Sequence, residues 1–337
     1  MQQQLPIETC NPQFGRYLYP PANKMREAQQ DVTWTAQEVP VGKDRSDFKK
    51  NLTSEQVRLV TVTLQIFVEI EQKVGEVWDT VASWYPHSEI EGCCAEFMRM
   101  EKAVHAFFYQ KVSDTLHIDP DTVSENQRTI TVLKSKLEFL KQITSNLDKN
   151  KPLSLATVAI IEQVLLFSNF AMLKSFQANG NNLIKNTVTG VDFVVQDEQL
   201  HGEFAGYLFR TVLQENSTAK VYDVSTLHED ILKLLYEVIA HEDAVIDYTF
   251  GGEEYINGTS GKDLKAFIRS RANKVLNMLG YDNHFEELED PISEWFYKGS
   301  NSIKVHDFFA GITNQYRRAW KQEGFSRLRY IKEQSFE

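Results

Sequence analysis

Cysteine is scarce in this chain, which has three among its 337 residues: Cys10, Cys93 and Cys94. An odd number with two adjacent members does not form the even, spaced framework of a disulfide-stabilised secreted domain. The N-terminus, MQQQLPIETC, also lacks the basic and apolar segments of a secretory signal. We therefore expect a protein of the reducing cytoplasm.

Proline and glycine are sparse too, with 9 and 16 residues, and no Gly/Ser-rich or Pro-rich tract marks a linker. The chain has no run of about 18 uncharged apolar residues, so we expect no membrane span. Positive charge is also scarce. The chain has 36 Lys and Arg residues against 47 Asp and Glu residues, which gives a net charge of −11. Nucleic acids and anionic membranes bind clustered Lys and Arg, so neither is an expected partner.

The dominant pattern is helical periodicity, and few alternating apolar and polar runs indicate strands. Thr53 and Gln56 form a capping-box signature at the start of the first long helix. The predicted helices span about 54–84, 88–117, 124–147, 154–178, 182–215, 225–250 and 260–280. The helix at 154–178 is largely apolar, as expected of a central buried helix. The sequence therefore predicts an all-α bundle.

The length fits two domains or one large helical domain. We predict an irregular N-terminal segment over 1–50, with 18-LYPPAN-23 as a breaker, that packs on the body. The helical domain follows over 51–283, and a helical or irregular tail over 284–337 ends the chain.

The segment 195-VQDEQLHGEF-204 carries the strongest chemical signal. Glu198 and His201 are three residues apart, so both project from one helix face, as a bundle presents ligands to a buried metal. Alone the pair is weak evidence, because a solvated helix face produces the same spacing. The segment 97-FMRMEKAVHAFFYQ-110 adds His105 behind a second acidic, helical stretch.

Two further helices contribute lone acids in apolar surroundings, Glu71 and Glu162. A buried carboxylate is costly unless a cation or hydrogen bonds offset its charge. Two carboxylate–histidine helices plus a Glu from each of two others is the ligand pattern of ferritin-like dimetal carboxylate proteins. Oxygen ligands with two imidazoles favour iron or manganese over structural zinc, which favours Cys.

These residues resemble the small, radical-generating subunit of class I ribonucleotide reductase over roughly residues 31–205. Glu71, followed by 74-VG-75, is similar to the first carboxylate of that family. Tyr109, four residues after His105, stands at the position of the radical tyrosine. Asp197 completes an Asp-Glu-x-x-His string. The family pattern implies metal ligation by Glu71, Glu101, His105, Glu162, Glu198 and His201.

The resemblance also implies a route for the oxidising equivalent. Trp34, in 32-VTWTAQEV-39, resembles the residue that begins electron transfer at the protein surface, and it would form a relay with Asp197 and His105. Tyr330 resembles the tyrosine of the tail, and 306-HDFFAG-311 resembles an Asp/Asn-Phe-Phe segment. The apolar shell of the radical tyrosine would be Leu166, Phe170 and Val194.

The implied activity is that of a ribonucleoside-diphosphate reductase, active only with a separate large subunit. This chain would generate the oxidising equivalent with dioxygen, peroxide or superoxide and store it on Tyr109 or on the metals. The large subunit would use it to reduce ribonucleotides. The family also implies a homodimer and a C-terminal peptide, 327-RLRYIKEQSFE-337, that docks on the large subunit.

One departure from the family pattern concerns the second carboxylate. The residue three before His105 is Lys102, whereas Glu101 is four before it. Three readings are open. Glu101 ligates after a small helix adjustment and Lys102 points outward; or Lys102 lies beside the metals and hydrogen-bonds a ligand; or Lys102 replaces metal charge in a metal-free centre.

Two other functions are open at the sequence level. One is another ferritin-like oxidase or oxygenase, such as a desaturase or a ligand-binding oxidase, which would have an elongated apolar pocket beside the metals. The other is a helical scaffold, in which Glu162 and Glu198 would lie far apart or face solvent. The sequence contains no recognisable signal for the metal, the oxidant, the preference for di- or triphosphates, or the source organism.

Overall fold

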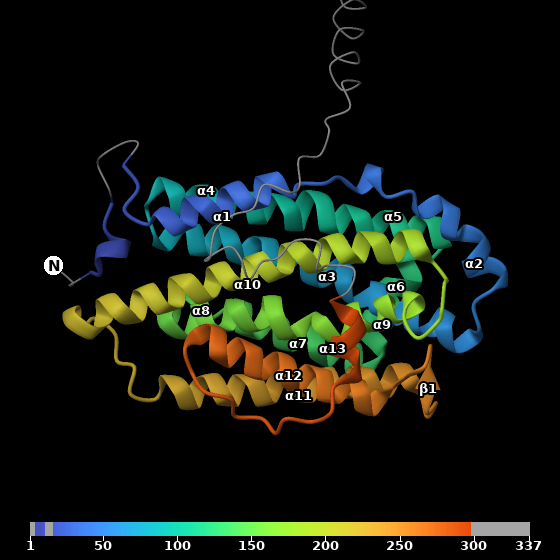
Figure 1. Ribbon diagram of the computed structural model, residues 1–337. Coiled ribbons are helices and arrows are strands. Elements are labelled where there is room, and N and C mark those ends of the chain that lie inside the picture. Colours follow the sequence, from blue (N-terminus) through green and yellow to red (C-terminus); the bar gives the residue numbers. More distant parts are fainter. Residues whose placement is uncertain (1–3, 11–15, 298–337) are drawn as a thin grey trace, which may run out of the picture. The chain divides into compact units, whose positions relative to one another are not determined.

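Helices make up nearly all regular structure in the computed structural model, which describes residues 4–10 and 16–297 (Figure 1). The α-helices are α1 (Pro20–Asp31), α2 (Arg45–Lys50), α3 (Ser54–Trp84), α4 (Ser88–Met100), α5 (Ala106–Leu116), α6 (Pro120–Thr129), α7 (Thr131–Thr144), α8 (Lys151–Ile160), α9 (Phe167–Lys174), α10 (Lys185–Ala219), α11 (Leu227–Phe250), α12 (Gly261–Leu279) and α13 (Pro291–Phe296). Two π-helices interrupt this set, η4 (Glu101–His105) and η6 (Ile161–Leu165). Short 3₁₀ turns lie at η1 (Pro6–Glu8), η2 (Ala36–Glu38), η3 (Val41–Asp44), η5 (Leu147–Lys149) and η7 (Ser175–Gln177).

The described strands form one small hairpin, in which β1 (Tyr255–Ile256) pairs antiparallel with β2 (Thr259–Ser260). The prediction of an all-α fold is confirmed.

Helix α3 shows how the sequence builds the core. Its capping box is formed as predicted, with Thr53 Oγ1 accepting from the Gln56 amide and Gln56 Oε1 accepting from the Thr53 amide. Phe67, Glu71 and Trp78 recur at helical spacing and are fully buried. One acid therefore enters the core on the same stripe as large apolar side chains.

The central helical run is α8, η6 and α9, in which every residue from 154 to 174 is buried. The stretch Lys151–Gln177 is long and apolar enough to cross a membrane by length and composition, yet its apolar window lies wholly inside the protein. It is therefore a core helix. The sequence predicts one continuous helix here, whereas the structure divides it with the π-helix η6, which periodicity does not reveal.

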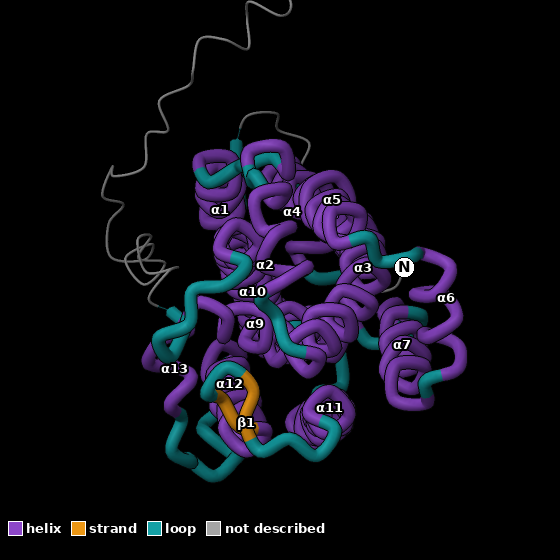
Figure 2. Tube along the Cα trace, turned by 90° about the vertical axis from the view of Figure 1, so that its right-hand side faces the viewer, coloured by secondary structure: helices purple, strands orange, loops and turns teal. Residues whose placement is uncertain are grey.

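Four helical runs surround the predicted ligands: α3; α4 with η4 and α5; α8 with η6 and α9; and α10. Viewed along the bundle, α1, α4 and α5 lie on one side and α11 and α12 on the other (Figure 2). Helix α12 packs against α9, α10 and η6, which brings residues near position 270 up to the ligand-bearing helices.

The interpretation of 18-LYPPAN-23 as a breaker was wrong. Pro20 and Pro21 occupy the first two positions of α1, where a missing amide hydrogen costs nothing and the fixed φ favours a helix. This helix packs against α4 and α10, and its Met25 and Gln29 side chains are buried. The predicted helix at 124–147 also divides, at Ile130, into α6 and α7. In the tail, α13 packs on α9 and α12.

Candidate metal centre

Both acids on the interrupted helices lie within π-helices. Glu101 is the first residue of η4 and His105 the last, and Glu162 is the second residue of η6. A π-turn has more residues per turn than an α-turn, so positions four apart lie closer to one line along the helix. The π-turn therefore lets Glu101, four residues before His105, face the same side as that histidine.

Six predicted ligands converge from four helical runs. One group consists of Glu71, Glu101, His105 and Glu198, and a second consists of Glu101, Glu162, Glu198 and His201. Within each group, one potential ligand atom from every residue lies within 4.8 Å of the others. Glu101 and Glu198 belong to both groups, so each would be available to both of two adjacent ions.

All six side chains are fully buried. Burial raises the pKa of Glu101 and Glu162 well above the usual range, and the neighbouring carboxylate of Glu198 raises both further. Burial likewise raises the pKa of Glu198. Among the described residues, Glu101 has no hydrogen-bond donors other than the two imidazoles, whereas Glu198 also has a side-chain hydrogen bond with Glu162. Such a cluster of buried acids with free oxygens fits divalent cations.

His105 has two different sides. Its Nδ1 faces the cluster, 3.1 Å from Glu198 Oε1 and 3.3 Å from Glu71 Oε2. Its Nε2 lies 2.9 Å from Asp197 Oδ2. Burial disfavours the charged imidazole, but Glu101 and Asp197 outweigh that effect and raise its pKa. A carboxylate behind a histidine fixes the ring orientation and increases the basicity of the ligand nitrogen.

Asp197 connects His105 to Trp34. The Trp34 indole Nε1 donates to Asp197 Oδ2 at 2.8 Å, and Gln29 Nε2 donates to Asp197 Oδ1 at 2.8 Å. The Trp34 and His105 rings stack with centroids 6.0 Å apart. Trp34 is only 1% exposed, and its role in electron transfer stays a prediction. Its indole is buried against Phe108 and Phe193.

Tyr109 is fully buried on α5, and its hydroxyl has no hydrogen-bond partner among the described residues. Its ring stacks on Phe67 with centroids 4.5 Å apart, and Phe67 in turn stacks on Phe170. Burial raises the pKa of Tyr109 well above its usual value, and the charge of Glu71 adds to that shift. Leu166 and Val194 are also fully buried, whereas their contact with Tyr109 stays a prediction.

Lys102 lies outside the cluster, because Glu101 is buried and Lys102 is exposed. A Cβ placed on Gly75 would come 2.6 Å from Lys102 Cγ, so the glycine leaves room for the lysine stem to cross α3. This position favours the first of the three readings, in which Glu101 is a ligand and Lys102 points outward.

Comparison with known proteins agrees with this geometry. The profile of the family "Ribonucleotide reductase, small chain" matches residues 13–291. The chain belongs to this family. The predicted family and the predicted ribonucleoside-diphosphate reductase function are confirmed.

Several family members are similar over most of their length. The beta subunit of Bacillus phage SPbeta is 26% identical over 294 residues, covering 85% of each chain. The nrdF2 beta subunit of Mycobacterium tuberculosis (strain H37Rv) is 28% identical over 296 residues, covering 84% of this chain and 85% of that protein.

Among solved structures, the dimanganese(II)-NrdF of Streptococcus sanguinis has a TM-score of 0.75 at 20% identity, covering 87% of this chain and 99% of that chain. The Clostridium botulinum R2 subunit has a TM-score of 0.76 at 18% identity, covering 86% and 91% respectively. These likenesses confirm the ferritin-like fold.

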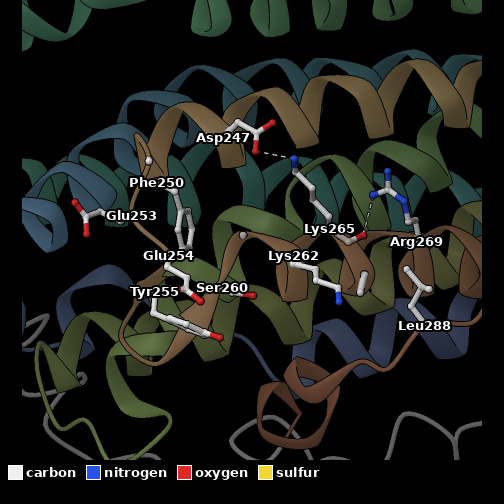
Figure 3. A pocket seen from close by; sticks show the side chains of 13 residues that line it. Asp247, Phe250, Glu253, Glu254, Tyr255, Ser260, Lys262, Lys265, Arg269 and Leu288 are labelled. Atoms are coloured by element: carbon white, nitrogen blue, oxygen red, sulfur yellow. Dashed lines mark hydrogen bonds and ion pairs between the residues drawn. The ribbon is translucent and has the colours of Figure 1, made fainter.

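The two alternative functions predicted different geometry. A scaffold would keep Glu162 and Glu198 apart or exposed, but they are buried and share one group. An oxygenase of another kind would have an apolar pocket beside the metals. The pocket in Figure 3 lies between α11, the hairpin and α12, and none of the cluster residues lines it, so it is not the pocket that such an oxygenase would have. Its Lys265 is paired with Asp247 at 2.6 Å, and its Arg269 with Asp243 at 2.7 Å.

The sequence alone did not predict several residues that contact the ligand cluster. Trp78 Nε1 donates to Glu162 Oε1 at 2.6 Å, and Phe97 packs 4.3 Å from the His201 ring, centroid to centroid. Trp78 could have been found, because it lies seven residues after Glu71 on the same face of α3. Gln29 and Gln163 carry no comparable local signal.

Proposed function

We propose that this chain is the subunit of ribonucleoside-diphosphate reductase that holds two ions of iron or manganese and stores an oxidising equivalent on Tyr109. The observation that carries the proposal is the pair of overlapping ligand groups with Glu101 and Glu198 in common. The ligands would be Glu71, Glu101, His105, Glu162, Glu198 and His201. The dimanganese centre named for the Streptococcus sanguinis protein supports manganese as one candidate.

When bound, the two ions would supply one-electron oxidising chemistry, with dioxygen, peroxide or superoxide as the terminal oxidant. Hard oxygen donors and two imidazoles suit iron or manganese, and no cysteine belongs to either ligand group. The four carboxylates carry a charge that would balance two divalent ions in a region from which water is excluded.

Tyr109 would lose one electron and its hydroxyl proton during oxidation. Because its pKa is raised, the phenol keeps that proton until the electron leaves. The carboxylate cluster contains the bases that can take it, and the charge of Glu71 has the largest electrostatic influence on the phenol. The stacked rings of Phe67 and Phe170 keep water from the resulting radical.

Trp34, Asp197 and His105 would conduct electrons between the centre and a separate large subunit. The continuous hydrogen bonds from Trp34 to Asp197 and on to His105 support this relay. Because Trp34 is buried, the last step to the large subunit needs another group. Tyr330 is the predicted one; it lies outside the described residues, as do 306–311 and 327–337.

The partner would be the large subunit, as expected of a small chain of this family. A homodimer and a location in the cytoplasm stay predictions. The net charge of −11 supports the expectation that neither nucleic acid nor a membrane is a partner.

The first experiment is metal analysis combined with electron paramagnetic resonance of protein produced with iron and manganese supplied. We expect about two ions per chain together with a tyrosyl radical or a coupled metal signal. A stable organic radical without metal would instead revive the metal-free reading of Lys102. Absence of both metal and radical would contradict the proposed function.

A further inference from the structure

The π-helix η6, which carries Glu162, is held by two buried cations from other helices. Arg271 on α12 is 1% exposed, and its Nε donates to the Gln163 carbonyl at 2.9 Å. Lys136 on α7 is fully buried, and its Nζ donates to the Leu165 carbonyl at 3.0 Å. A change from α to π spacing alters which amide reaches which carbonyl, so side-chain donors at this turn stabilise the irregular spacing.

Arg271 contacts the side chain of Gln163 as well as its main chain. Its Nη2 donates to Gln163 Oε1 at 2.5 Å, and its guanidinium lies 3.7 Å from the Phe167 ring centroid. Nη1 donates to the Tyr297 hydroxyl at 2.8 Å. Burying a guanidinium is costly unless its nitrogens have partners, and these contacts give each of the three nitrogens one hydrogen bond in a fixed orientation.

Gln163 extends this restraint to α10. With Oε1 occupied by Arg271, its Nε2 donates to the main-chain carbonyl of Glu198. A Cβ on Gly202 would overlap the Gln163 amide, so the glycine is what lets this side chain reach α10. One glutamine therefore ties the residue next to Glu162 to the main chain of Glu198.

The link acts on one side of the ligand cluster more than on the other. Glu162 and His201 belong to the second ligand group only, whereas Glu71 and His105 belong to the first only. Gln163 is adjacent to Glu162, and Gly202 is adjacent to His201. A shift of η6 against α10 would therefore disturb the second group and leave most of the first in place.

We propose that Gln163, clamped by Arg271, is a positioning residue that fixes the spacing between Glu162 and the Glu198–His201 pair, and so sets the affinity of the metal position that they form. The inference rests on the proposed dimetal site. Lys136, which also pairs with Glu242 at 2.6 Å, secures the far end of η6.

The test is a titration of metal-free, full-length protein with Mn²⁺, with free Mn²⁺ counted by electron paramagnetic resonance. Wild type is compared with Gln163→Met, which keeps side-chain length but removes both amide groups, and with Gly202→Ala, which displaces the amide. We expect the variants to retain one tight Mn²⁺ while the second binds about 10- to 100-fold more weakly. At one equivalent they should show an isolated Mn²⁺ signal.

Asn273→Ala is the matched control. Asn273 is buried on α12 two residues from Arg271, but its amide bonds to Phe285 and its neighbour in the adjoining loop rather than to η6. It should lower the melting temperature without changing the ratio of the two affinities. Arg271→Lys, which keeps a cation but not the double contact, should give a smaller loss at the second position and replaces Gln163→Met if that variant does not fold.

Equal affinities in wild type and variants, or a parallel loss at both positions as from general destabilisation, would overturn the positioning role. A wild-type chain that binds fewer than two Mn²⁺ would overturn the proposed dimetal site itself, and the inference with it. The two failures are therefore distinguishable in the same titration.

Discussion

The two ligand groups share Glu101 and Glu198 but differ in what lies behind their histidines. His105 Nε2 faces Asp197, which leads to Trp34 and Gln29, and Tyr109 lies one turn further along the same helix. His201 Nε2 has no hydrogen-bond partner in the described part of the chain, and its ring lies against Phe97 and Trp78. The first side is connected by hydrogen bonds to Trp34 and Gln29, whereas the second is enclosed by aromatic rings.

This difference indicates that the two sides of the buried centre have different roles. A hydrogen-bonded carboxylate adjusts the basicity of a ligand and provides a path for charge. Aromatic packing with few polar contacts holds a ligand in place and excludes water. Substitutions on the His105 side should therefore affect radical chemistry, and those on the His201 side should affect metal binding.

The largest effect is expected from Tyr109→Phe. The change removes the hydroxyl but keeps the ring that stacks on Phe67, so fold and metal content should persist while ribonucleotide reduction falls to background. Activity is measured with the large subunit present, and metal is measured on the same sample. Full activity would mean that the oxidising equivalent resides elsewhere, for example on the metals.

Glu101→Ala tests one of the two residues that both groups share. Because it removes a ligand from each group, metal content should fall from about two per chain to below one. Lys102→Ala is the matched control. Lys102 is next to Glu101 in the sequence, but its side chain is exposed, so its removal should leave the metal content unchanged. The opposite result, with metal lost in Lys102→Ala only, would place the lysine at the centre.

Asp197→Asn tests the path on the His105 side. An amide cannot accept from Trp34, Gln29 and His105 as the carboxylate does, so the radical yield or turnover should fall about 10- to 100-fold. Metal analysis should still find both ions. If both turnover and radical yield stayed at the wild-type level, the proposed relay would be excluded.

The metal-free protein should lose stability as pH rises. Burial raises the pKa of Glu101, Glu162 and Glu198 above 4.5, so the folded state binds more protons than the unfolded chain. Their contribution is complete below pH 4.5 and is lost as pH increases through the raised values, and the raised pKa of His105 has the same sign. Melting temperatures with a chelator should therefore fall as pH rises above 4.5, and Mn²⁺ should reduce this fall. A flat metal-free profile would argue against the cluster.

The smallest effect is expected from Trp78→Phe, which removes only the hydrogen bond to Glu162 and some ring area. A buried hydrogen bond to a charged group contributes about 1.5–3 kcal/mol. Affinity for the second Mn²⁺ should weaken, while the radical formed on Tyr109 keeps its spectrum. A changed tyrosyl spectrum with normal metal affinity would reverse the assignment of the two sides.

Local patterns predicted the long helices well, because capping residues and apolar periodicity act within a few turns. Glu198 and His201 could be predicted as a pair for the same reason, since their spacing places both on one helix face. The helix at Pro20 was missed because proline was taken as a stop rather than as a first-turn residue. The pairing of Gln163 with Arg271 joins residues 108 positions apart, and nothing in the local sequence announces it.

The five-residue turn at Glu101 bears on how related proteins are found. The family pattern has a carboxylate three residues before the histidine. In the π-helix, a carboxylate four residues before the histidine reaches the same centre, so the ligand set tolerates one additional residue between the two. A genome search that demands two copies of Glu-x-x-His would reject this sequence. A search that allows either spacing would retain it and any other chain that has the four-residue spacing.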